Sequence, residues 1–186
     1  MAHYLDNYKQ LIARVDALCT SIAASLGEQI TCSSGCSSCC TSITIFPVEA
    51  AAMREAVESL PEQQAEEIYR HVAKHAGNER CPLLLHHRCL LYDARPVICR
   101  THGLPIIYTA DGQRNSDCCP LNLNGTESLS GSSAVDLDKL NTLLVAINSI
   151  YLSQSNSPES SERLTIANVI TRQLTDTHSH HPKIVQ

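Results

Sequence analysis

Residues 31–42 read TCSSGCSSCCTS, and this stretch dictates what kind of fold the chain can have. Its four cysteines stand at positions 32, 36, 39 and 40, separated only by serine and glycine. The stretch has no hydrophobic periodicity, so it cannot form a packed core from its own side chains. Ordering it requires another source of free energy, and metal binding is one that folds cysteine-rich segments. The sequence therefore predicts a metal-binding loop.

A second cysteine-rich stretch covers residues 81–119. It contains Cys81, Cys89, Cys99, Cys118 and Cys119. In the first loop, the spacing Cys36-x2-Cys39 lets two thiolates converge on one centre, as in zinc and iron–sulfur sites. Soft thiolates select zinc, copper(I) or iron–sulfur centres over magnesium or calcium. We therefore expect the two stretches to meet and to share at least one metal centre.

Two pairs of cysteines are adjacent in the chain, Cys39-Cys40 and Cys118-Cys119. Because neighbouring side chains diverge, both members of a pair seldom bind one mononuclear ion. They can serve two metals or two irons of one cluster, or one member can point into the core. Without Cys19 and one member of the second pair, eight thiols remain, which suits two four-thiolate centres or one polynuclear cluster.

The segments around the two loops have the periodicity of helices. Apolar residues recur every three or four positions, prolines stand at the first turn of two segments, and Ser157-Pro158-Glu159 resembles a helix start. The expected helices cover residues 4–26, 47–60, 61–75, 134–152 and 159–174, with one short helical turn from Pro96. Asp111-Gly112 is typical of a hairpin turn.

The predicted fold class is mainly α, with helices flanking an irregular Cys-rich metal-binding knot and one small β-hairpin. At 186 residues the chain suits one domain. We expect this domain to span residues 1–174, with a metal-binding core at 31–120 between helices at 4–26 and 134–174. Residues 175–186 are predicted to form a flexible tail.

Composition excludes several classes of protein. With 14 basic and 19 acidic residues the net charge is −5, and aromatic residues total 4%, so the chain lacks the basic footprint and stacking platforms of nucleic-acid-binding proteins. No apolar run approaches the roughly 20 residues of a membrane span. The first ten residues lack the apolar segment of an export signal, so a cytoplasmic location is expected. Reduced, clustered cysteines there indicate metal or redox chemistry more than structural disulfides.

Other potential ligands have simpler explanations. Cys19 follows the helical spacing of its segment and is expected to be a small core residue. His71 and His75 lie four apart on a helix but lack the glutamate of an H-E-x-x-H zinc site.

Three histidines are candidates for one imidazole ligand: His86, His87 and His102. Five arginines in or directly before the second stretch can offset thiolate charge: Arg80, Arg88, Arg95, Arg100 and Arg114.

The segments CSSGCSSCC (32–40) and CPLLLHHRCLLYDARPVICR (81–100) resemble the CxxCxxCC family of bacterial proteins, also called YkgJ-like. The resemblance covers residues 32–119, and its most specific part is C-x-x-Y-x-x-R-P-x-x-C-R. The family is described as zinc- or iron-chelating and sometimes as iron–sulfur oxidoreductases. The resemblance implies these metal ligands: Cys32, Cys36, Cys39, Cys40, Cys81, Cys89, Cys99 and Cys118, with Cys119 as the alternative to Cys118. One departure is the three-residue gap between Cys32 and Cys36, where the family name implies two.

The function expected from these observations is metal binding. Clustered thiolates would hold an iron–sulfur cluster or zinc or iron ions, in redox chemistry. The alternative is a structural, zinc-stabilised module for interaction or metal handling, without catalysis. The sequence contains no nucleotide-binding or hydrolase motif and assigns no enzymatic reaction. The expected partners are metal ions, with no nucleic acid and no membrane.

Overall fold

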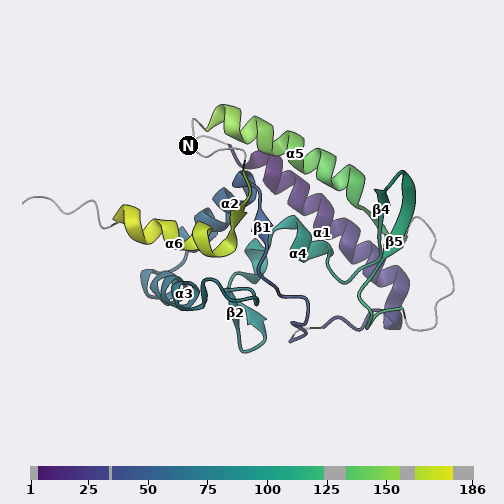
Figure 1. Cartoon of the computed structure of the whole chain (residues 1–186), viewed down its shortest axis with the longest axis horizontal. Coiled ribbons are helices and arrows are strands. Elements are labelled where there is room, and N and C mark those ends of the chain that lie inside the picture. Colours follow the sequence, from purple (N-terminus) through teal and green to yellow (C-terminus); the bar gives the residue numbers. More distant parts are fainter. Residues whose placement is uncertain (1–3, 34, 124–132, 156–161, 178–186) are drawn as a thin grey trace, which may run out of the picture.

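The computed structural model describes residues 4–33, 35–123, 133–155 and 162–177 (Figure 1). Helices dominate, as predicted. The two longest, α1 (Asp6–Leu26) and α5 (Leu137–Gln154), pack along each other, and the short α4 (Val97–Thr101) packs against α1. Helix α2 (Pro47–Glu58) packs against α5 and also against α3 (Glu62–His75) and α6 (Ile166–Thr177), which pack on each other. No helix in these ranges is long and apolar enough to cross a membrane.

The helix ends follow from local chemistry. Gly27 ends α1 with a φ of 54°, a conformation that glycine adopts without a steric penalty. Pro47 is the first residue of α2, where its missing N–H is harmless. The Asp136 side chain accepts a hydrogen bond from the Lys139 backbone N–H at 3.2 Å and caps α5.

The strands are short and form three small sheets. Strands β4 (Ile106–Ala110) and β5 (Gln113–Asp117) form the hairpin predicted from Asp111-Gly112, whose φ values of 52° and 72° suit a two-residue turn. Strand β6 (Val135–Asp136) adds to β4 in parallel. The other two sheets are the pairs β2–β3 (Leu84–Leu85 with Arg88–Cys89) and β1–β7 (Thr44–Ile45 with Leu164–Thr165).

The last helix differs from its prediction at both ends. It begins at Ile166, whereas a start near 159 was expected, because Leu164–Thr165 pairs as a strand with Thr44–Ile45. The Thr165 hydroxyl then accepts a hydrogen bond from the Asn168 N–H at 3.1 Å, as a helix cap does. The proposed cap at 157–159 lies outside the described residues, as does 178–186 of the predicted tail, and α6 extends to Thr177.

Three apolar clusters hold these elements. One joins α2, α3 and α6 to the second cysteine-rich stretch through Leu83 and Leu91, with Cys81 and Cys89 packed at its edge. A second lies between α1, α2, α4 and α5, and a third joins the end of α1 to β4 and β6. Ile30 and Ile43, which flank the first cysteine-rich stretch, and Leu83 and Leu104 of the second therefore pack in these clusters.

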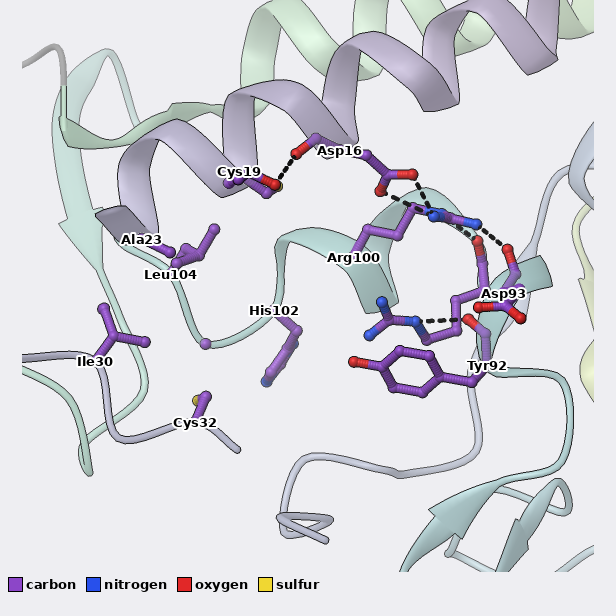
Figure 2. A pocket seen from close by; sticks show the side chains of 13 residues that line it. Asp16, Cys19, Ala23, Ile30, Cys32, Tyr92, Asp93, Arg100, His102 and Leu104 are labelled. Atoms are coloured by element: carbon purple, nitrogen blue, oxygen red, sulfur yellow. Dashed lines mark hydrogen bonds and ion pairs between the residues drawn. The ribbon is translucent and has the colours of Figure 1, made fainter. Parts of the chain in front are cut away.

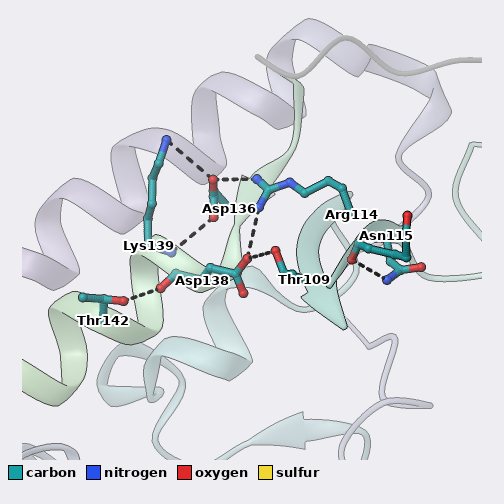
Figure 3. A network of polar contacts seen from close by, with 8 residues as sticks. Thr109, Arg114, Asn115, Asp136, Asp138, Lys139 and Thr142 are labelled. Carbon is teal, nitrogen blue, oxygen red and sulfur yellow. Dashed lines mark hydrogen bonds and ion pairs between the residues drawn. The ribbon is translucent and has the colours of Figure 1, made fainter. Parts of the chain in front are cut away.

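A polar network fixes the hairpin to the start of α5 (Figure 3). Arg114 donates to Asp136 at 2.7 Å and to Asp138 at 3.0 Å, and the Thr109 hydroxyl donates to Asp138 at 2.7 Å. The Lys139 ammonium lies 3.6 Å from Asp136. The network holds β5, and with it the start of the segment that carries Cys118 and Cys119, against the helical layer.

Candidate metal centre

The two cysteine-rich stretches meet, as expected. Between them, the Cys81 N–H donates to the Cys40 carbonyl at 3.0 Å and the Ser42 N–H donates to the Glu79 carbonyl at 2.7 Å. The Arg80 guanidinium donates to the Ser37 carbonyl at 2.8 Å. These contacts lie beside the thiols, so the backbone itself brings cysteines of the two stretches together.

Four cysteines form what we call the inner quartet: Cys40, Cys81, Cys89 and Cys99. Each is half-buried. Cys40 closes the first loop, Cys89 stands opposite Leu84 in the β2–β3 pair, and Cys99 is presented by α4. Burial, followed by the charges of the other three thiols, raises the pKa of Cys99 to about 12. One member thus comes from the first stretch and three from the second.

Three further cysteines, Cys32, Cys36 and Cys39, are exposed, and we call them the outer trio. The charge of Cys36 raises the pKa of Cys32, Cys39 and also Cys40, so this thiol interacts with the other two members of the trio and with one member of the inner quartet. In each of these three thiols burial is the larger cause of the raised pKa.

The pair Cys118-Cys119 divides between two environments. The Cys119 thiol interacts with Cys32 through its charge and a side-chain hydrogen bond, both of which raise the pKa of Cys32 after the larger effect of burial. Burial, the Asp117 carboxylate and the Cys119 thiol raise the pKa of Cys118, whose backbone N–H donates to Asp117 at 2.8 Å. Of the two, Cys119 is the one whose charge affects a cysteine of the first stretch, Cys32.

The inner quartet and the outer trio line one cavity of about 720 Å³. Its remaining wall is largely apolar, with side chains such as Ile43, Met53 and Leu91. None of the ten cysteines, all of which lie in the described ranges, forms a disulfide. Seven free thiols and an apolar wall match the environment in which proteins hold thiolate-bound metals.

The donor chemistry suits zinc or iron, but the thiols are not closed around a point. Across the described residues, no three Cys, His, Asp or Glu side chains come close enough together to hold one metal ion. Burial raises the pKa of every member of the inner quartet, so these thiols are protonated near neutral pH without metal. Metal binding would displace those protons and requires the side chains to turn toward a common point.

Arginine charges oppose this effect, as the sequence predicts. Arg80 lowers the pKa of Cys40 and Cys81, and Arg95 lowers that of Cys89 and Cys99. Arg114, in contrast, belongs to the hairpin network described above. Arg80 and Arg95 therefore favour thiolates where a metal would need them.

Two charged groups hold α4, and with it Cys99, in place. Arg100 donates to both Asp16 carboxylate oxygens at 2.8 and 2.7 Å, to the Arg95 carbonyl at 2.7 Å and to the Asp93 carbonyl (Figure 2). Glu49, only 1% exposed, accepts from the Val97 N–H at the start of α4 and from the Phe46 N–H at the start of α2. Sequence reasoning missed the roles of Glu49 and Asp16 at α4, because their partners Val97 and Arg100 lie far away in the chain.

The histidines fall into two groups, those bonded to backbone carbonyls and those near the cysteine cavity. The rings of His71 and His75 each bond a backbone carbonyl, of Leu84 at 3.1 Å and of His71 at 2.8 Å, so both have a structural role.

His86 and His87 form the tight turn between β2 and β3, with φ values of 47° and 63°. The His87 ring contacts the Ser37 hydroxyl at 3.0 Å and lines the cavity, as does His102. His87 and His102 are therefore the two histidines that line the same cavity as the thiols. Cys19 packs against two apolar clusters, as predicted.

Comparison with known proteins agrees with this geometry. Residues 31–120 match the family model CxxCxxCC, described as a "putative zinc- or iron-chelating domain". The match covers just under half of the 186-residue chain. Its limits coincide with the predicted core at 31–120 and enclose the inner quartet, the outer trio, Cys118 and Cys119. Comparison with curated proteins and with solved structures returned no match.

Proposed function

We propose that this CxxCxxCC domain binds zinc or iron through the inner quartet. The observation that carries the proposal is the convergence of Cys40, Cys81, Cys89 and Cys99, from two separate stretches, on one cavity where their charges interact. Four thiolates are a complete ligand set for a tetrahedral zinc site or an iron–sulfur cluster. The family description supports the choice of zinc or iron.

Cys36 and Cys39 extend this centre toward solvent. They are exposed, line the same cavity and interact electrostatically with Cys40. We propose that they add ligands for a second metal or for the outer edge of an iron–sulfur cluster, which would give the centre an accessible position for redox chemistry. Ligation by Cys32 and Cys118 stays a prediction from the resemblance.

A structural zinc module is the second candidate. It is supported by the half-buried position of the inner quartet at the junction of the two stretches, since closed four-thiolate zinc sites hold loops together. Both candidates place the protein in a reducing compartment such as the cytoplasm, where free thiols persist. The colour and iron content of anaerobically purified protein distinguish the two.

A pair of serine variants tests the proposal. Cys89→Ser removes one member of the inner quartet, and Cys19→Ser removes a thiol that packs between helices. We expect Cys89→Ser to lose most of its zinc or iron and to show faster amide exchange in both 31–42 and 81–100, because the metal ties the two stretches together. Cys19→Ser should keep the wild-type metal content. Full metal content in Cys89→Ser, by elemental analysis, would refute the quartet as the ligand set.

A further inference from the structure

A cleft of about 580 Å³ lies beside the cysteine cavity (Figure 2). Tyr92, Arg95 and His102 line both the cleft and the cysteine cavity, so the two spaces share a wall. Of the described residues that line the cleft, none belongs to the inner quartet. A space of this volume is in the range of pockets that bind small organic molecules.

The two arginines of the cleft differ in how many acceptors they face. Arg100 uses all three of its side-chain nitrogens, because it donates to the Asp16 carboxylate and to the carbonyls of Arg95 and Asp93. The Arg95 Nε donates to the Tyr92 carbonyl at 2.9 Å. Its two terminal NH₂ groups have no acceptor among the described residues. Arg95 therefore has four N–H bonds available for a ligand.

The Arg95 guanidinium is already held in position by the protein. It lies over the Tyr92 ring, with its central carbon 3.6 Å from the ring centroid. The bond from Nε to the Tyr92 carbonyl restrains it from a second direction. Because the side chain is ordered by the fold, a ligand that binds there costs little additional conformational entropy. A guanidinium fixed in this way presents a planar fork that matches the two oxygens of a carboxylate.

Two further polar side chains face the same cleft. Tyr92 is 57% exposed, and His102 is exposed as well. Within the described part of the chain, neither the Tyr92 hydroxyl nor the His102 ring has a hydrogen-bond partner. In Figure 2 the Tyr92 hydroxyl points toward His102 across the hollow. Both groups can therefore hydrogen-bond a ligand that Arg95 holds.

The charges of the cleft favour a ligand with a single negative charge. Asp16 and Arg100 form an ion pair at 2.7 Å and neutralise each other. The other two charged side chains that line the cleft, Asp93 and Arg95, also have opposite signs. A phosphate dianion would therefore meet too little positive charge, whereas a carboxylate matches the one guanidinium that has no acceptor.

The opposite end of the cleft is apolar. In Figure 2, Ala23, Ile30 and Leu104 lie together at the end away from Tyr92. All three pack in the apolar cluster at the end of α1. A hydrocarbon chain that reaches from Arg95 toward these side chains would be removed from water, which favours binding.

The wall between the two ends is fixed by close contacts around Gly103. This residue has a φ of +95°, and a Cβ atom there would lie 2.8 Å from the Cys32 sulfur. The Asn122 amide, only 3% exposed, donates to the Gly103 carbonyl at 2.6 Å and to the Cys32 sulfur at 3.3 Å. Its oxygen accepts from the Thr31 N–H at 2.8 Å. The cleft is therefore formed before a ligand binds.

We propose that the cleft binds a small organic acid. The carboxylate lies on the Arg95 guanidinium, beside Tyr92 and His102, and the apolar chain lies against Ala23, Ile30 and Leu104. Because Arg95 also lines the cysteine cavity, the carboxylate is held at the boundary between the two spaces. The site does not use the inner quartet, so it goes beyond the proposed metal binding and does not depend on it.

Hexanoate tests the proposal on the full chain, purified with zinc, which is diamagnetic. An NMR titration follows the amides of Thr20 and Gly103, two residues that line the cleft. Hexanoate should bind about tenfold more tightly than hexanol, which has the same chain without the charge, and this ratio is the equivalent of about 1.4 kcal/mol. Arg95→Gln should abolish that preference. Arg88→Gln, the matched control, removes an exposed arginine that lines the cysteine cavity but not the cleft, and should bind as wild type.

Three results would overturn the proposal. Equal affinities for hexanoate and hexanol would show that no carboxylate is recognised, and this comparison requires only the wild-type protein. Equal weakening by Arg95→Gln and Arg88→Gln would indicate a general effect of charge. An oxygen ligand that appears at the zinc edge in X-ray absorption when hexanoate is added would place the carboxylate on the metal. These outcomes are independent of the metal content of Cys89→Ser, which tests the inner quartet alone.

Discussion

Replacing Glu49 with glutamine tests how the fold positions Cys99. The Glu49 carboxylate accepts from the Val97 N–H at 3.0 Å and from the Phe46 N–H at 2.9 Å, so it joins the first turns of α4 and α2. A glutamine oxygen can accept from one of these groups only. Its NH₂ group then faces the other N–H, and a buried donor is left without an acceptor.

The magnitude follows from these two bonds. A hydrogen bond to a charged group contributes about 1.5–3 kcal/mol, and one of the two is lost. The loss is partly offset because a neutral amide is easier to bury than a carboxylate. We therefore expect Glu49→Gln to lower the free energy of unfolding by about 2 kcal/mol. Glu55→Gln, on the same helix, removes an exposed ion pair with Lys9 and should cost less than about 1 kcal/mol.

Urea unfolding followed by circular dichroism measures the effect, and amide exchange at Val97 locates it. Burial raises the pKa of Glu49, so the folded state binds this proton more tightly than the unfolded chain. The resulting stability is complete below the unfolded pKa and is lost as the pH rises through the folded pKa. Glu49→Gln should abolish that decline. Unchanged stability, with Val97 still protected from exchange, would refute this account of Glu49.

Two further predictions concern the surroundings of the site. Gly103→Ala should displace the Cys32 sulfur and destabilise the protein by more than Gly77→Ala, which has a similar φ of +86° but open space around its Cβ position; equal unfolding free energies would show that the contact with Cys32 is unimportant. Arg114 lowers the pKa of Asp136, so the stability this carboxylate contributes is present above its unfolded pKa and lost as the pH falls through the folded value. Titration by NMR should show that its pKa returns toward normal in Arg114→Gln, and an unchanged value would contradict the network.

Much of the fold is local in origin, which is why the sequence predicts it. The periodicity of 4–26 gives α1, Pro47 begins α2, and Asp111-Gly112 forms the hairpin turn, each through interactions within a few residues. The strands of two residues carry too little pattern to be recognised. The start of α6 was misplaced because the Leu164–Thr165 strand before it depends on pairing with Thr44–Ile45, far away in the chain.

The cysteine-rich stretches were identified as one site, but its internal order came from the structure. The sequence left open which member of Cys118-Cys119 joins the others; in the structure Cys119 belongs to the turn at Asn122, and its charge raises the pKa of Cys32. Nothing local marks Asn122, because its three partners lie 91, 90 and 19 residues away. The division between inner quartet and outer trio likewise depends on burial, which spacing does not encode.

X-ray absorption at the zinc and iron edges of anaerobically purified protein tests the central claim most directly. If the inner quartet binds the metal, the protein contains it in stoichiometric amount, and each ion has four sulfur ligands, at about 2.3 Å for zinc. The same measurement on Cys89→Ser should show the loss of that shell. A shell of oxygen or nitrogen, or protein with intact thiols and no stoichiometric metal, would contradict the account.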